Sequence, residues 1–228
     1  MAEAAGRVRP VTMAGEQLLP VVAPLAPLFP EGGLRRGTTV VVKSGGTGVT
    51  SLALAVGVAA SQAGSWCAAV GLPALGMVAA AGLGMALERF ALVPHPGEQW
   101  PAVTAALIDA VDVILLRPPR GIRSSEARRL TARVRERGVV LVVRGTWPEG
   151  ADLSLSIATI GQAGWRGLGQ GYGYLQARSV EVIATGRGAA SRERRVPLWL
   201  PGNNGTVEKR RVALEQAPAT PAAASAAG

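Results

Sequence analysis

A glycine-rich segment, KSGGTGVT at residues 43–50, carries the clearest chemical signal in the chain. Loops that bind phosphate follow the pattern G-x-x-x-x-G-K-[ST] between a strand and a helix. Their backbone N–H groups surround the phosphates, the lysine neutralises charge and the hydroxyl holds Mg²⁺. Gly48 and Thr50 occupy the second glycine and hydroxyl positions, but Lys43 replaces the first glycine and Val49 replaces the essential lysine.

Valine cannot supply charge or a hydrogen bond to a triphosphate, so the spacing predicts a degenerate phosphate loop. We assign to it Gly45, Gly46, Thr47, Gly48, Val49 and Thr50. Two alternatives stay open. The segment can be a plain strand-to-helix connection, or Lys43 can reach back and take the place of the missing lysine.

Strands and helices alternate around this loop. We expect buried or β-branched strands at 38–43, 66–71, 90–93, 111–116 and 139–143, and helices at 50–63, within 72–89, at 100–110 and at 124–137. Such alternation requires crossover connections, and it predicts a parallel, doubly wound α/β sheet. The alternating segments 152–159, 179–185 and 195–200 are typical of antiparallel strands added to the C-terminal edge.

Composition excludes several classes of protein. The 228 residues include one cysteine, Cys67, and one histidine, so a disulfide framework and an ordinary zinc site are ruled out. Aromatic residues make up 4% of the chain, which disfavours a surface for stacking nucleic-acid bases. We therefore expect no metal and no cofactor.

The uncharged stretch from Ser44 to Leu87 is long enough to span a bilayer. It is interrupted by many glycines and its apolar residues are mostly alanine. Buried parallel strands and their covering helices also form uncharged runs. We expect no membrane span, and the polar start of the chain does not have the form of a secretory signal.

The net charge is +9, and arginine supplies 22 of the 24 basic residues. Such a charge is typical of proteins that contact nucleic acid, but a bias of the coding sequence towards arginine produces the same composition. Candidate contacts to DNA or a partner are Arg128, Arg129, Arg133, Arg135, Arg194, Arg195, Arg210, Arg211, Trp165, Tyr172 and Tyr174. The alternative interpretation is a solvated helix face and a packed edge hairpin.

Several segments together resemble the ATPase core of the RecA recombinases. These are FPEGGLRRG at 29–37, the strand and degenerate loop after it, WCAAV at 66–70 and VDVILL at 111–116. Their order and spacing match that core from about residue 25 to residue 200. Within that family the chain is most similar to the ImuA′ group, the RecA-like accessory proteins of the actinobacterial and mycobacterial mutasome. The resemblance implies a lead-in at 1–24, a RecA-like core at 25–201 and a basic, then disordered, tail at 202–228.

The departures from RecA concern its catalytic groups. Where RecA has an acidic residue that helps to hold Mg²⁺, this chain has Arg117, and Pro73 lies at or near the position of the glutamate that activates water. With Val49, three groups needed for ATP hydrolysis are replaced, so the resemblance implies a protein that is not an ATPase. The connections 117–123 and 144–151 are also too short to enclose a DNA strand as the RecA loops do.

The resemblance implies a cytoplasmic assembly factor in SOS-induced translesion synthesis and mutagenesis. Its expected partners are ImuB, a homologue of Y-family polymerases, and indirectly an error-prone C-family polymerase, with DNA as a further candidate. Two alternatives stay open: a nucleotide-binding switch or weak ATPase of the RecA family, and a stand-alone DNA-binding protein.

Overall fold

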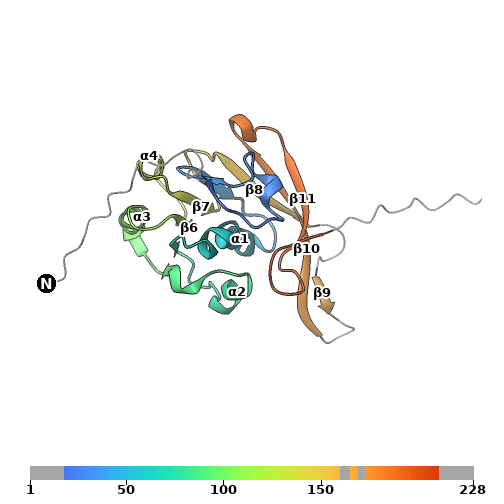
Figure 1. Ribbon diagram of the computed structural model, residues 1–228. Coiled ribbons are helices and arrows are strands. Elements are labelled where there is room, and N and C mark those ends of the chain that lie inside the picture. Colours follow the sequence, from blue (N-terminus) through green and yellow to red (C-terminus); the bar gives the residue numbers. More distant parts are fainter. Residues whose placement is uncertain (1–17, 160–164, 169–172, 211–228) are drawn as a thin grey trace, which may run out of the picture.

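The computed structural model describes residues 18–159, 165–168 and 173–210. Ten strands form one sheet, in the order β12-β11-β10-β8-β3-β7-β6-β4-β5, and β9 pairs with β10 outside this path. Two further short strands, β1 and β2, pair with each other. The expected α/β architecture, a mostly parallel sheet with antiparallel strands at the C-terminal edge, is confirmed (Figure 1).

Most elements lie where their sequence patterns predict them. The strands are β1 (Leu18–Leu19), β2 (Leu34–Arg35), β3 (Thr39–Val42), β4 (Cys67–Val70), β5 (Phe90–Val93), β6 (Val113–Leu116), β7 (Val140–Arg144), β8 (Leu153–Thr159), β9 (Trp165–Leu168), β10 (Gly173–Gly186), β11 (Arg194–Trp199) and β12 (Glu208–Lys209). The α-helices are α1 (Val49–Gln62), α2 (Met77–Gly82), α3 (Trp100–Ile108) and α4 (Ser124–Arg137). Short 3₁₀ turns lie at Ala26–Leu28, Leu87–Arg89, Gly97–Gln99 and Gly188–Ala190.

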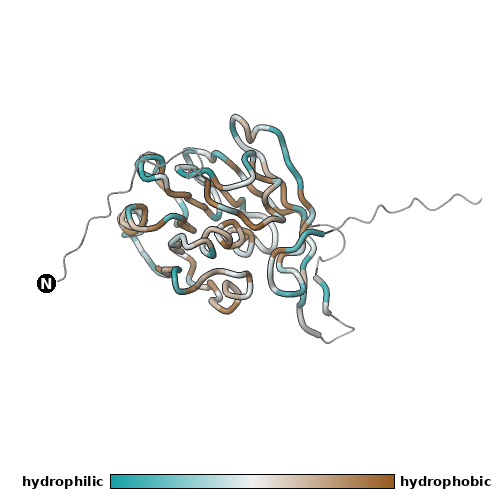
Figure 2. The backbone as a smooth tube through the Cα atoms, in the orientation of Figure 1, coloured by the Kyte–Doolittle hydropathy of each residue, from teal (hydrophilic) through white to brown (hydrophobic). Residues whose placement is uncertain are grey.

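Helices cover both faces of the parallel part of the sheet. One buried cluster joins α1, α2 and the antiparallel strands to one face, and a second joins α3 and α4 to the other face. The four residues of each of β3, β4 and β6 are all buried, which explains their continuous apolar sequences. Figure 2 shows hydrophobic residues concentrated in these central strands and in α1.

The direction of β8 differs from the expectation. We expected 152–159 to be antiparallel, but β8 runs parallel to β3 and antiparallel only to β10. Because β7 is also parallel to β3, the short connection after Arg144 must return along the sheet to its opposite end. Buried Trp147 anchors this return by donating a hydrogen bond from Nε1 to Thr131 Oγ1 of α4, at 3.0 Å. An alternating pattern does not encode strand direction, so the sequence alone could not give this result.

The predicted helix within 72–89 is present but short. Only Met77–Gly82 is helical, with a 3₁₀ turn at Leu87–Arg89 before β5. Gly82 and Gly84 end the helix, and Gly84 has a φ of +100°, which residues other than glycine rarely adopt. Among the described residues, no helix combines the length and the apolar character needed to cross a bilayer.

Candidate functional site

The carboxyl ends of the parallel strands lie at one edge of the sheet, which we call the carboxyl edge. It comprises the loops after Val42, Val70, Leu116 and Arg144, and the open sheets of α/β proteins bind ligands at this edge. The degenerate phosphate loop lies here, between β3 and α1. Gly48 is the N-cap of α1 with φ +95°, and Gly45 and Gly46 have φ +130° and +124°. The expected context of strand, loop and helix is therefore present.

Val49, at the position of the missing lysine, points into the protein. It is the first residue of α1, is 5% exposed and belongs to the buried cluster beneath that helix. A longer charged side chain in this place would have to leave the core to meet a ligand. Lys43 is exposed, and so are Gly45, Gly46 and Thr47, whereas Thr50 is partly buried.

A buried cation lies against the loop. A Cβ atom built on Gly48 would collide with the guanidinium group of Arg178, which comes from β10 and is 5% exposed. Arg178 Nε donates a hydrogen bond to the carbonyl oxygen of Leu200 at 3.0 Å. Burial lowers the pKa of this arginine. The start of α1 is thus packed against a positive side chain of the same chain.

Arg117 and the loop holding Pro73 come together at the carboxyl edge. Strands β4 and β6 are parallel neighbours, with Val70 beside Leu116, and the Arg117 N–H donates to Val70 O at 2.9 Å. A Cβ on Gly71 would collide with the Arg117 carbonyl oxygen, so Gly71 is required there. Pro73 and Arg117 are both exposed. Hence Arg117 and Pro73, which the resemblance to RecA sets at or near two acidic positions, follow adjacent strands and carry no negative charge.

Arg144 ends the strand beside Arg117. In the register of β6 and β7, Leu116 lies opposite Val143, so the next residues of the two strands are neighbours. Burial and then the charge of Arg117 lower the pKa of Arg144. The described residues contain no group of three or more His, Cys, Asp or Glu that could hold a metal ion. Arg117 and Arg144 thus give the end of β6 and β7 a positive charge.

The arginines of α4 are mostly engaged in ion pairs within the chain. Arg128 lies 3.6 Å from Glu149 and Arg135 lies 3.9 Å from Asp152. Arg133 donates to Asp109, which also pairs with Arg137 at 3.0 Å. These hydrogen bonds and charges lower the pKa of Asp109, the hydrogen bond from Arg133 being the largest cause. Arg129 is exposed, and no ion pair joins it to another described residue.

The second basic cluster lies on the outer antiparallel strands. Arg195 pairs with Glu193 at 2.7 Å and Glu181 at 3.3 Å, while Arg194 donates to the carbonyl groups of Ala189 and Arg192. Arg210 and Arg166 lie 5.9 and 4.3 Å from the ring centre of Trp199. Trp165 and Tyr174 belong to β9 and β10, and Tyr172 and Arg211 lie outside the described residues.

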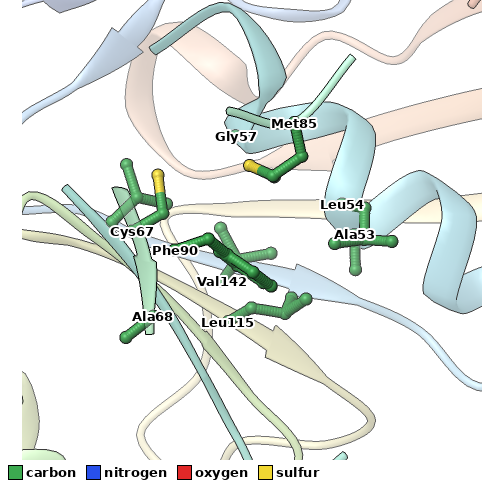
Figure 3. A pocket seen from close by; sticks show the side chains of 10 residues that line it. Ala53, Leu54, Gly57, Cys67, Ala68, Met85, Phe90, Leu115 and Val142 are labelled. Atoms are coloured by element: carbon green, nitrogen blue, oxygen red, sulfur yellow. The ribbon is translucent and has the colours of Figure 1, made fainter. Parts of the chain in front are cut away.

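A cavity lies beneath α1 and away from the carboxyl edge. Figure 3 shows its lining of apolar side chains, which includes Met85, Phe90 and Cys67. Its volume is about 10 Å³, which is at the lower limit for one water molecule. Burial, and to a lesser extent Asp112, raise the pKa of the Cys67 thiol to about 12. The cavity is a packing defect lined by an inert thiol, and it offers no room for a ligand.

Sequence reasoning missed Arg144 and Arg178. Arg144 is the last residue of an apolar strand, and its sequence position predicted only the start of a connection. Arg178 lies in a stretch without any motif, 130 residues after the glycine that it contacts. The strand order could have located Arg144, but no signal in the sequence indicates the approach of Arg178 to Gly48.

Comparisons with known proteins agree with this architecture. The sequence model of a family described as the MT3502 N-terminal domain matches residues 27–149. The uncharacterized protein Rv3395c of Mycobacterium tuberculosis is 35% identical over 117 residues, which cover 50% of this chain and 57% of that protein. The crystal structure of the RadB recombinase covers 84% of this chain and 98% of its own, with a TM-score of 0.60 and 14% identity. At that identity the likeness shows the fold alone, which is RecA-like.

Proposed function

The chain belongs to the family of the MT3502 N-terminal domain, and we propose that it is a RecA-like assembly factor that performs no ATP hydrolysis. In this proposal it acts as ImuA′ proteins do. It binds ImuB in the cytoplasm and thereby supports an error-prone C-family polymerase during damage-induced translesion synthesis. The RecA-like fold supports the general assignment. The partners rest on the resemblance of residues 25–200 to the ImuA′ group.

The composition of the carboxyl edge carries the non-catalytic part of the proposal. Hydrolysis of ATP requires a lysine at the phosphates, an acid for the metal and a base for the attacking water. Val49 is directed into the core, Arg117 follows β6 and exposed Pro73 follows β4. Each replacement removes a different contribution to ATP hydrolysis, so restoring only one of the three groups would not restore turnover.

Electrostatics also disfavour a magnesium nucleotide at this edge. Arg117 and Arg144 are close enough for the charge of one to lower the pKa of the other. A divalent cation at the end of β6 would face their combined positive charge without an acidic ligand. The guanidinium of Arg178 in addition packs against Gly48, where the loop would have to approach a phosphate.

The enzymatic part is tested by steady-state hydrolysis of ATP and GTP with Mg²⁺, using the full chain and its Thr50→Ala variant. We expect phosphate release at the level of a protein-free control for both proteins. A catalytically active RecA-family protein assayed in parallel sets the sensitivity. Turnover by the wild type that Thr50→Ala abolishes would overturn the proposal.

The partner part is tested by co-expression with tagged ImuB, followed by affinity purification and size-exclusion chromatography. We expect the two chains to elute together in a fixed ratio. The same experiment with a tagged Y-family polymerase that does not take part in induced mutagenesis is the specificity control. Elution of the two chains apart, at concentrations where both are folded, would refute the assignment to the ImuA′ role.

A further inference from the structure

Three adjacent strands place basic residues side by side at the carboxyl edge. In the register of the sheet, Val42 of β3 lies opposite Arg144 of β7, and Leu116 of β6 lies opposite Val143. Lys43 and Arg117 directly follow these strands. Since neighbouring strands are about 4.8 Å apart, the three positions form one short row along the edge, with Arg117 and Arg144 in register on one face of the sheet and Lys43, one residue beyond Val42, on the opposite face. Arg120 and Arg123 are exposed in the loop after Arg117 and extend its charge.

This basic row has no acidic counterpart among the described residues. None of Lys43, Arg117 and Arg144 forms an ion pair within that part of the chain. Glu126 is the nearest acid along the chain after Arg117, and its carboxylate accepts the backbone N–H of Arg123 at 3.3 Å, where it caps α4. Most arginines of α4, by contrast, are paired with aspartate or glutamate.

Arg144 adds a donor that is already removed from water. Its Nε atom is buried and has no hydrogen-bond acceptor among the described residues. A buried donor without an acceptor costs free energy, and the partly exposed side chain of Arg144 would recover it by turning Nε towards an incoming oxyanion in a charge-assisted hydrogen bond. The lowered pKa of Arg144 agrees with a guanidinium held in a desolvated, positive environment. The geometry therefore favours an anionic group placed between Arg144 and Arg117.

We propose that the basic row at Lys43, Arg117 and Arg144 binds an acidic peptide segment of a protein partner. This inference rests on the proposed function, because it names the surface through which an assembly factor would hold its partner. Carboxylates of successive aspartate or glutamate residues match the planar donors of arginine. The site reuses the ligand-binding edge of the fold and needs no metal ion.

A peptide fits this surface better than a nucleotide or a nucleic-acid strand. The described residues at the edge supply no acid for the metal of a nucleotide, and Arg178 packs against the phosphate loop. No aromatic ring among the described residues of this edge is exposed for base stacking. Trp147, which lies closest along the chain, is 6% exposed and bonded to Thr131.

Fluorescence anisotropy of the full chain tests the proposal with two labelled probes of equal length. One is a twelve-residue peptide of aspartate, glutamate and serine, and the other is a twelve-nucleotide oligothymidine. The test variant is Arg117→Gln/Arg144→Gln. The matched control is Arg35→Gln/Arg89→Gln, which removes the same charge from exposed residues at the other end of the sheet. Thermal melting shows that each protein is folded.

We expect the peptide to bind, with an affinity that falls at least tenfold in the test variant and less than twofold in the control. An equal loss in both variants would reduce the effect to net charge and overturn the proposal. Tighter binding of oligothymidine than of peptide, lost in the test variant, would assign the basic row to nucleic acid instead.

Capture by tagged ImuB separates this inference from the proposed function. If wild type and control are captured but the test variant is not, both are supported. If all three are captured equally, the basic row is not the docking surface, while the partner assignment stands. If none is captured although the wild type binds the peptide specifically, the partner assignment fails and the anionic-peptide site stands.

Discussion

The two ends of the parallel sheet carry the same type of basic residue in opposite settings. At the amino end Arg36 pairs with Asp112 at 2.9 Å, and Asp112 also accepts the N–H of Trp66 at 3.1 Å. Asp152 accepts the N–H of Thr39 at 2.8 Å. At the carboxyl edge Arg117 and Arg144 face each other without an acid between them. Within the described residues, Arg36 at the amino end therefore has an acidic partner, whereas Arg117 and Arg144 at the carboxyl edge have none.

This difference has a physical cause in the fold. Arginine at the amino end fastens the starts of strands that come from distant parts of the sequence, and it contributes to stability. Arginine at the carboxyl edge is partly desolvated and repelled by its neighbour, so it reduces stability. Residues that reduce stability in the free protein are typical of binding sites. Four predictions test the contrast, in order of decreasing effect.

Substitution Asp112→Ala is expected to lower the free energy of unfolding by about 3 kcal/mol. It leaves Arg36, whose side chain is 25% exposed, without its carboxylate, and it removes the acceptor of the Trp66 N–H. Urea unfolding monitored by circular dichroism measures the change. Adding Arg36→Ala should recover part of the loss in a double-mutant cycle. A loss of under 1 kcal/mol for Asp112→Ala would show that the pair of Arg36 and Asp112 contributes little to stability, which would contradict the contrast between the two ends.

Substitution Gly48→Ala is expected to cost about 2 kcal/mol, more than its matched control Gly45→Ala at about 1 kcal/mol. Both glycines have positive φ, but a Cβ at Gly45 meets open space whereas one at Gly48 collides with Arg178. Differential scanning calorimetry gives the two values. Equal losses would show that Arg178 moves aside freely, and that the loop end is open to a ligand.

The thiol of Cys67 reports on the amino end, because Asp112 contributes to its raised pKa. Its folded pKa of about 12 lies above the value of 9.0 for a free thiol, so the native state holds the proton longer than the unfolded state. The contribution of this thiol to the free energy of unfolding is complete below pH 9, and it decreases by about 1.4 kcal/mol per pH unit as the pH rises towards 12. Urea unfolding of wild type and Cys67→Ala from pH 8 to 10 measures it. A constant difference between the two proteins across this range would contradict the prediction.

Substitution Arg117→Gln is expected to raise the free energy of unfolding by about 0.5 kcal/mol at low ionic strength, because it relieves the repulsion of Arg144. The gain should shrink as salt is added, since screening weakens the same repulsion. Arg35→Gln, which loses the exposed pair with Glu31, is the comparison at the other end. Chemical denaturation at 20 and 500 mM salt separates the two variants. Destabilisation by Arg117→Gln would mean that an acid stabilises this arginine after all.

Much of the architecture could be predicted from local patterns. The apolar strands around Val41, Ile114 and Val142, the loop before Thr50 and the helix ending at Gly138 all lie where composition and spacing placed them. The direction of β8 could not be predicted, because an alternating strand satisfies either direction equally well. The helix expected within 72–89 is present, but its bounds could not be predicted, since alanine-rich sequence favours a helix and the glycines on both sides limit it.

The candidate site was only partly predictable. The replacement of catalytic groups by Val49, Pro73 and Arg117 stays a prediction from the resemblance to RecA; the structure shows that Val49 begins α1 and that Pro73 and Arg117 follow β4 and β6. The arginines of α4 were given equal weight as contacts for DNA, yet Arg128, Arg133 and Arg135 are paired with acids that are distant in sequence. Net charge does not distinguish a paired arginine from an available one.

Residue types and their periodicity by themselves determined the α/β class and the order of the elements, because these depend on local preference and on composition. Only the tertiary structure decided which arginines are neutralised and which are not. The fold brings residues more than a hundred positions apart together, as with Arg144 beside Val42 and Arg178 beside Gly48. The interaction of charges depends on that distance in space and on burial, and neither is encoded in any short stretch of the chain.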